Sequence, residues 1–208
     1  MQRPSVAEAH GRFRGEQSHG FMYDVDGVEV ASHKSDTVYS LIRILWNICV
    51  FRYGPQALPD SRSTLPWIVF LHLLVGTGYN LPFTDLPHAL QLELATLLFS
   101  YAFVRLVLLL SHRNERFEKA LGALLGSDVI ISAVGLFLEV ILAQGLELQA
   151  LWSSTSLLLM AWSFIVAAHI FRHVFAVGFA VGIIIAFAFF FTNLVFMVLV
   201  QGGLGGGA

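Results

Sequence analysis

A short polar segment between two long apolar runs sets the strongest constraint on this fold. The segment SHRNERFEKA occupies residues 111–120, and apolar runs at 89–110 and 121–143 flank it. A helix that crosses a bilayer needs about 20 predominantly apolar residues, and both runs reach that length. The pattern therefore predicts a hairpin of two membrane-spanning helices joined by a tight polar turn.

The composition extends this prediction to the whole chain. Charged residues make up 12% of the 208 residues and hydrophobic residues 56%, whereas about 25% of a soluble domain is charged. Cys49 is the sole cysteine, which excludes an intramolecular disulfide and a cysteine-based metal cluster. We predict an all-α, polytopic membrane helix bundle in contact with the lipid bilayer.

About five transmembrane helices and one interfacial helix are expected. Polar residues at 36, 40, 43 and 47 form a narrow stripe on a helix at 36–53, which predicts an amphipathic helix lying on the membrane. The transmembrane domain covers 54–200, with spans at about 66–81, 88–110, 120–143, 151–170 and 174–200. The Gly-rich tail at 201–208 is expected to be flexible.

Residues 1–35 form a polar region without a long apolar run. We expect this region to be mostly disordered and cytoplasmic, because it lacks the apolar core of a signal peptide. The segment 21–30 alternates apolar and acidic residues around Asp26–Gly27, which is typical of a hairpin turn. Whether a hairpin forms is left open, since an isolated one is marginally stable.

The positions of the basic residues predict the orientation. Lys and Arg occur before the first span, between the second and third, and between the fourth and fifth. Arg113, Arg116 and Lys119 form a basic turn within the polar segment 111–120. Basic loops favour the cytoplasmic side, so the N-terminus is expected in the cytoplasm and the C-terminus outside.

Four charged residues fall inside the predicted hairpin. Arg105 and Asp128 lie at similar distances from the turn, on opposite arms, which predicts an ion pair that fixes the register of the hairpin. The alternative is that Arg105 extends to the interface while Asp128 faces a polar crevice. Glu93 and Glu139 are expected to reach the outer interface, or else to form a carboxylate pair that responds to protons or cations.

The histidines are expected at a membrane boundary. His169 and His173 share one helical face at the end of the fourth span, and His72 and His112 are predicted at comparable depth. No Glu or Cys accompanies them in a metal-binding pattern. We therefore expect interfacial histidines and no metal or haem site.

Small residues favour close packing of two helices. Gly122 and Gly126 lie in the third span, and Gly178 and Gly182 in the fifth. Glycines four residues apart let helix backbones approach closely. We expect these two spans to pack tightly through them.

The sequence carries no catalytic motif. It lacks a Walker A loop, an HExxH motif, a nucleophile elbow and a dinucleotide fingerprint, so neither a catalytic residue nor a cofactor is expected. Three Arg residues near the N-terminus do not form a basic patch, which argues against nucleic-acid binding. The expected protein is therefore not an enzyme.

With five closely spaced spans and the segment RYGPQALP before the first span, the chain resembles the Yip1-like family of small membrane proteins. The segments LWNICVFRYGPQALP and WSFIVAAHIFRH are similar to uncharacterised inner-membrane proteins of Gram-negative bacteria. This resemblance implies a bacterial inner-membrane organiser, adaptor or accessory subunit that binds another membrane or cytoplasmic protein. A second copy of the chain is a further candidate partner. The alternative is a small transporter or proton-coupled channel that uses Glu93, Asp128 and Glu139, with Arg105 as counter-charge. A haem- or quinone-associated subunit is the third hypothesis.

Overall fold

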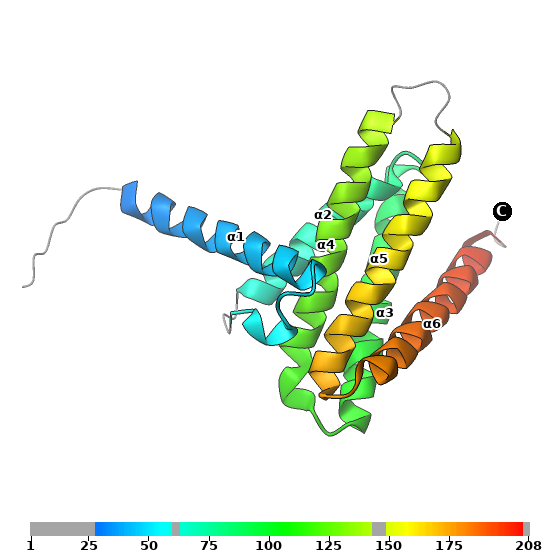
Figure 1. Ribbon diagram of the computed structural model, residues 1–208. Coiled ribbons are helices and arrows are strands. Elements are labelled where there is room, and N and C mark those ends of the chain that lie inside the picture. The colour runs from blue at the N-terminus through cyan, green and yellow to red at the C-terminus, as the bar shows by residue number, and fades with distance from the viewer. Residues whose placement is uncertain (1–27, 60–62, 143–148, 206–208) are drawn as a thin grey trace, which may run out of the picture. The chain divides into compact units, whose positions relative to one another are not determined.

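Every regular element that the structure describes is a helix. The structure is a computed structural model, and it describes residues 28–59, 63–142 and 149–205. The elements in these ranges are α1 (Val28–Cys49), η2 (Pro55–Ala57), α2 (Thr64–Asn80), α3 (Leu86–Leu110), η3 (Asn114–Arg116), α4 (Phe117–Leu142), α5 (Gln149–Phe175) and α6 (Phe179–Gly205) (Figure 1). The predicted all-α membrane bundle is confirmed.

Four of the described helices, α3, α4, α5 and α6, are long and apolar enough to cross a membrane. The chain is therefore an integral membrane protein. The first predicted span corresponds to α2, which has 17 residues. At 1.5 Å per residue α2 is about 25 Å long, slightly shorter than the hydrocarbon core of a typical bilayer.

The N-terminal helix differs from the prediction at both ends. We expected a helix at 36–53, whereas α1 begins at Val28 and ends at Cys49. Residues 28–37 belong to a separate compact unit, so only the part of α1 from Val38 onward is described with the bundle. Of the predicted hairpin and disordered region, residues 1–27 lie outside the described residues, while Val28–Val30 are helical rather than extended.

Within the unit Val38–Ala208, α4 is the central helix. It packs against α2, α3 and α5, and its most extensive contact is with α2. The contact between α3 and α4, the two arms of the predicted hairpin, is smaller. Figure 1 shows α4 and α5 side by side, with α6 along the far side of α5. The main packing partner of α4 is thus α2, and neither α3 nor α5, which flank α4 in sequence.

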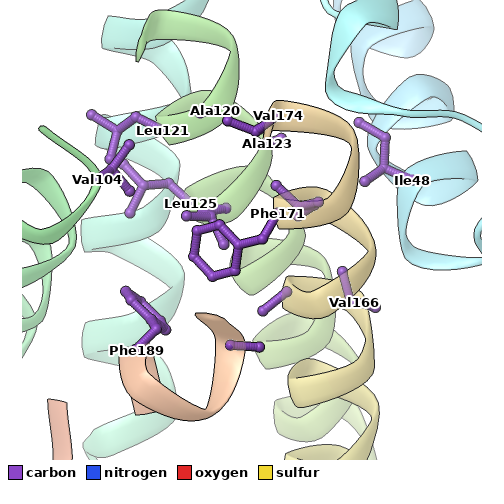
Figure 2. Close-up of a cluster of buried hydrophobic side chains, with 14 of the residues drawn as sticks. Ile48, Val104, Ala120, Leu121, Ala123, Leu125, Val166, Phe171, Val174 and Phe189 are labelled. Atoms are coloured by element: carbon purple, nitrogen blue, oxygen red, sulfur yellow. The ribbon is translucent and has the colours of Figure 1, made fainter. Parts of the chain in front are cut away.

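The apolar core is centred on Phe171 of α5. Its ring lies beside Leu125 of α4 and Phe189 of α6 in Figure 2, and the centroids of the Phe171 and Phe189 rings are 5.9 Å apart. The ring of Phe103 from α3 lies 6.2 Å from that of Phe171. Such aromatic pairs contribute about 0.5–1.5 kcal/mol each beyond their buried area. This cluster therefore ties α3, α4, α5 and α6 together.

Three connections meet on one side of the bundle. Arg116, in the turn between α3 and α4, donates hydrogen bonds to the carbonyl oxygens of Val174 at 2.8 Å and His173 at 3.4 Å, near the end of α5. His169 donates from Nε2 to the carbonyl oxygen of Tyr53 at 3.0 Å, in the connection between α1 and α2. A basic side chain at the C-terminus of a helix also interacts favourably with the helix dipole.

The glycines allow close packing, but between other helices than those predicted. A Cβ at Gly126 of α4 would overlap Leu45 of α1, and one at Gly122 would contact Leu58 and Ile68. The glycines of α4 therefore face α1 and α2 rather than α6.

In α6, a Cβ at Gly182 would lie 2.5 Å from the carbonyl oxygen of Ala168, so that α6 packs closely on α5. Gly178 has open space around it. Of the two glycines predicted to pack in the fifth span, only Gly182 thus lies at a contact between helices.

Substitution of Gly178, just before α6, and of Gly182, within it, should have unequal effects. We expect Gly182→Ala to lower the free energy of unfolding by about 1–3 kcal/mol, because the backbones of α5 and α6 must separate. Gly178→Ala should leave it unchanged or raise it slightly. Thermal unfolding of both variants in detergent measures the difference, and equal melting temperatures would contradict the close contact at Gly182.

Cys49 is buried at the end of α1. Its side chain is 0% exposed, and Sγ lies 3.9 Å from the carbonyl oxygen of Ser127, to which it donates. Burial, together with the nearby Asp128 carboxylate, raises the pKa of the Cys49 thiol to about 12. The thiol is therefore protonated and shielded in the folded protein.

Cys49 should resist alkylation until the protein unfolds. We expect a maleimide reagent to label Cys49 at least about 100-fold more slowly in mild detergent than in denaturing detergent, because the thiolate is scarce and covered. The control is Cys49→Ala with Asp85→Cys, which places a thiol at an exposed position. Mass spectrometry follows both reactions, and equally fast labelling would mean that the end of α1 does not pack against α4.

Candidate functional site

Three ionisable side chains from three helices converge inside the bundle. They are His72 of α2, Glu93 of α3 and Asp128 of α4, and one polar atom from each lies within 4.8 Å of the others. Nδ1 of His72 is 3.1 Å from Oδ2 of Asp128. His72 is 1% exposed and Glu93 6% exposed. We call these three residues the HED cluster.

Gly76 makes room for the HED cluster. It lies one helical turn after His72 on α2, on the same face. A Cβ at Gly76 would overlap the Glu93 carboxylate, so the side chain from α3 lies directly on the backbone of α2. The glycine thus brings a carboxylate and an imidazole from neighbouring helices together.

Several polar groups at the site have no partner. Nδ1 and Nε2 of His72 are both buried without a hydrogen bond, although Nδ1 lies 3.1 Å from Oδ2 of Asp128. Among the described residues, Asp128 has an ion pair with His72, and neither carboxylate of the HED cluster is paired with Lys or Arg. An unsatisfied buried polar group costs about 1–3 kcal/mol, so this arrangement does not arise for stability.

A cavity adjoins the HED cluster. Its volume is about 80 Å³, and His72 and Asp128 both line it. A water molecule needs only about 10–15 Å³ of such volume, so that the cavity has room for several. Polar side chains from α3, α4, α5 and α6 also line it, namely Thr96, Ser100, Ser127, Ser163 and Asn193, and the rest of the lining is apolar. Hydroxyl and amide groups therefore reach a space between membrane-spanning helices.

The predicted ion pair between Arg105 and Asp128 is not formed. The guanidinium of Arg105 lies over the ring of Phe117, 5.5 Å from its centroid, while Asp128 lies against His72. The prediction was wrong because α4 begins at Phe117, within the polar segment. Asp128 therefore lies farther from the turn than the prediction assumed. It meets the N-terminal half of α3, which carries Glu93.

The two predicted outer carboxylates differ from each other. Glu93 does not reach an interface, because it is buried in the HED cluster. Glu139 is partly exposed and lies outside this cluster, with one carboxylate oxygen buried and without a hydrogen bond. The structure thus brings Glu93 together with Asp128 and His72 rather than with Glu139.

The remaining predicted residues lie apart from the cluster. The rings of His169 and His173 are 4.6 Å apart near the end of α5, where His169 is bonded to Tyr53. In the basic turn, Arg116 binds the end of α5.

His72 is the functional candidate that the sequence prediction missed. Its signal was a single histidine in the middle of an otherwise apolar helix, four residues before a glycine.

The HED cluster offers an imidazole nitrogen and carboxylate oxygens to a positive ion. Carboxylate oxygens and an imidazole nitrogen are ligands for cations, so the cluster favours a cation over an anion. No family model, curated protein or solved structure matches the chain. The resemblance to Yip1-like proteins therefore stays a prediction, and the site itself is the main guide to function.

Neutralising a member of the HED cluster should not weaken the fold. We expect Glu93→Gln in metal-free protein to keep or raise the melting temperature, because it removes a buried charge without a cationic partner. For a chain of this size each kcal/mol corresponds to about 2–4 °C. Glu115→Gln, at an exposed turn, is the control and should have no effect. A clear loss of stability for Glu93→Gln alone would indicate a structural carboxylate.

Proposed function

We propose that the chain is a small membrane transporter or channel for a cation, with the HED cluster as its ion-binding group. The observation that carries this proposal is a set of two carboxylates and one imidazole from three helices, beside a cavity of about 80 Å³ that polar side chains help to line. Ionisable side chains within membrane helices are costly and mark ion or substrate pathways. The cluster lies at the middle of α2 and α4, where a pathway has to cross the apolar layer.

The hypothesis of an organiser, adaptor or accessory subunit does not account for this cluster. That hypothesis depends on a binding surface, such as residues 1–35 or the basic turn, and needs no charge inside the bundle. Packing alone is better served by apolar side chains of similar volume, which are often as stable or more stable than a buried charged group. The presence of three ionisable groups without a basic partner therefore favours transport.

We further propose that the N-terminus is cytoplasmic and the C-terminus external, in a bacterial inner membrane. The connections that carry Tyr53, Arg116 and His173 meet on one side of the bundle, which supports alternating crossings by α2 to α6. Basic residues are concentrated in these connections, as expected for the cytoplasmic side.

Flux into reconstituted vesicles tests the proposal. Purified protein is placed in liposomes that contain a pH-sensitive dye or a dye for divalent metals, and a cation gradient is then applied. We expect a protein-dependent flux that falls at least about tenfold in Asp128→Asn and in Glu93→Gln, because each removes a charge that binds the ion. Glu115→Gln should retain full flux.

The interpretation depends on equal insertion of all variants. Protease accessibility of the connection at residues 51–59 gives the amount and orientation of protein in each preparation. Absence of any cation flux from correctly inserted protein contradicts the proposal. Flux that is equal in all variants would place the pathway away from the HED cluster.

A further inference from the structure

We infer that the HED cluster is a binding site for a divalent first-row transition-metal ion. This inference rests on the proposed function, which it deepens by naming the class of ion. Its three ligands would be one nitrogen of His72 and one carboxylate oxygen each from Glu93 and Asp128. The cavity beside His72 and Asp128 would supply water for the remaining coordination positions.

The donor set distinguishes between classes of cation. Ca²⁺ and Mg²⁺ prefer oxygen ligands alone, and a buried imidazole adds little for them. Imidazole nitrogen suits Zn²⁺, Fe²⁺, Co²⁺ and Ni²⁺, which also accept carboxylate oxygen. One histidine with two carboxylates is a mixed nitrogen and oxygen ligand set, which fits the transition metals of this second group. Mn²⁺ fits it less well, because Mn²⁺ prefers oxygen ligands.

The spacing of the donors is close to what such an ion requires. Ligands about 2.0–2.2 Å from Zn²⁺ lie roughly 3.3–3.5 Å from one another in a tetrahedral arrangement. His72 and Asp128 are already 3.1 Å apart, and all three donors fall within 4.8 Å.

The burial of His72 supplies an independent argument. Its side chain is 1% exposed, and neither Nε2 nor Nδ1, which lies 3.1 Å from Asp128, has a hydrogen bond. A histidine in the core of a bundle normally bonds both nitrogens to protein or water. An imidazole with a free nitrogen beside two carboxylates is a group in which a metal ion would satisfy the unpaired atoms.

The charges of the ligands also favour a divalent cation. Neither Glu93 nor Asp128 is paired with Lys or Arg among the described residues. A divalent ion bound by two carboxylates and a neutral imidazole gives a neutral site. The Asp128 side chain is 41% exposed, whereas His72 and Glu93 are buried, so that Asp128 is the member of the cluster that an entering ion can reach first.

Cobalt binding tests the inference directly. Full-length protein is purified in detergent, freed of its affinity tag and of metal, and titrated with Co²⁺, whose visible absorption reports a nitrogen and oxygen ligand set. We expect one Co²⁺ per chain, displaced by Zn²⁺ but not by a large excess of Mg²⁺. Substitutions His72→Gln, Glu93→Gln and Asp128→Asn should each weaken binding at least about 100-fold, because each removes a ligand.

Two controls separate ligand loss from misfolding. Gly76→Ala leaves all three ligands in place but displaces the Glu93 carboxylate, so it should weaken Co²⁺ binding while Gly78→Ala, whose Cβ would make only an ordinary contact with Leu136, does not. His88→Gln, at the start of α3 and outside the HED cluster, should bind like the unaltered protein. Zn²⁺ should also raise the melting temperature of the unaltered protein and not that of Asp128→Asn.

The outcomes separate this inference from the proposed function. No Co²⁺ spectrum, or one unchanged in all three ligand variants, overturns the metal site. If vesicles nonetheless conduct protons, a cation pathway stands without a metal site. Stoichiometric Co²⁺ binding with no flux of any cation supports the metal site and contradicts transport.

Discussion

The close packing of α2 against α4 determines where the charged groups of this bundle lie. It places His72 at 3.1 Å from Asp128. The same packing leaves the α3–α4 contact smaller, so that the half of α3 that carries Glu93, and not the half with Arg105, meets the site. Gly76 is the detail on which this depends, because a side chain there would occupy the position of the Glu93 carboxylate.

This arrangement has an energetic cost that the rest of the fold has to offset. A buried charge without a partner is costly in an apolar bundle, and here two carboxylates share one histidine. The aromatic cluster around Phe171 and the close contact of α5 with α6 at Gly182 provide the compensating packing. The apolar packing of α5 and α6 thus offsets the cost of placing ionisable groups between α2, α3 and α4.

The helical membrane fold could be predicted from the sequence, whereas the site could not. Apolar runs of about 20 residues have few alternatives to spanning helices, which is why α3 to α6 agree with the prediction. Which helices pack against each other could not be predicted in this way. Adjacency in sequence favoured packing of α3 against α4, whereas α4 packs mainly against α2. The error over Asp128 came from the start of α4, since three residues change both the depth and the face of a side chain. His72 was treated as a boundary residue because no periodic pattern separates a buried histidine from an interfacial one.

The most direct test of the central claim is the position of a bound metal in an experimental structure of the full-length protein with Co²⁺. The account predicts one anomalous scattering peak between α2, α3 and α4, at about 2.0–2.2 Å from a His72 nitrogen and from oxygens of Glu93 and Asp128. A peak elsewhere, such as beside His169 and His173, or an undisturbed cluster without any peak, would contradict it.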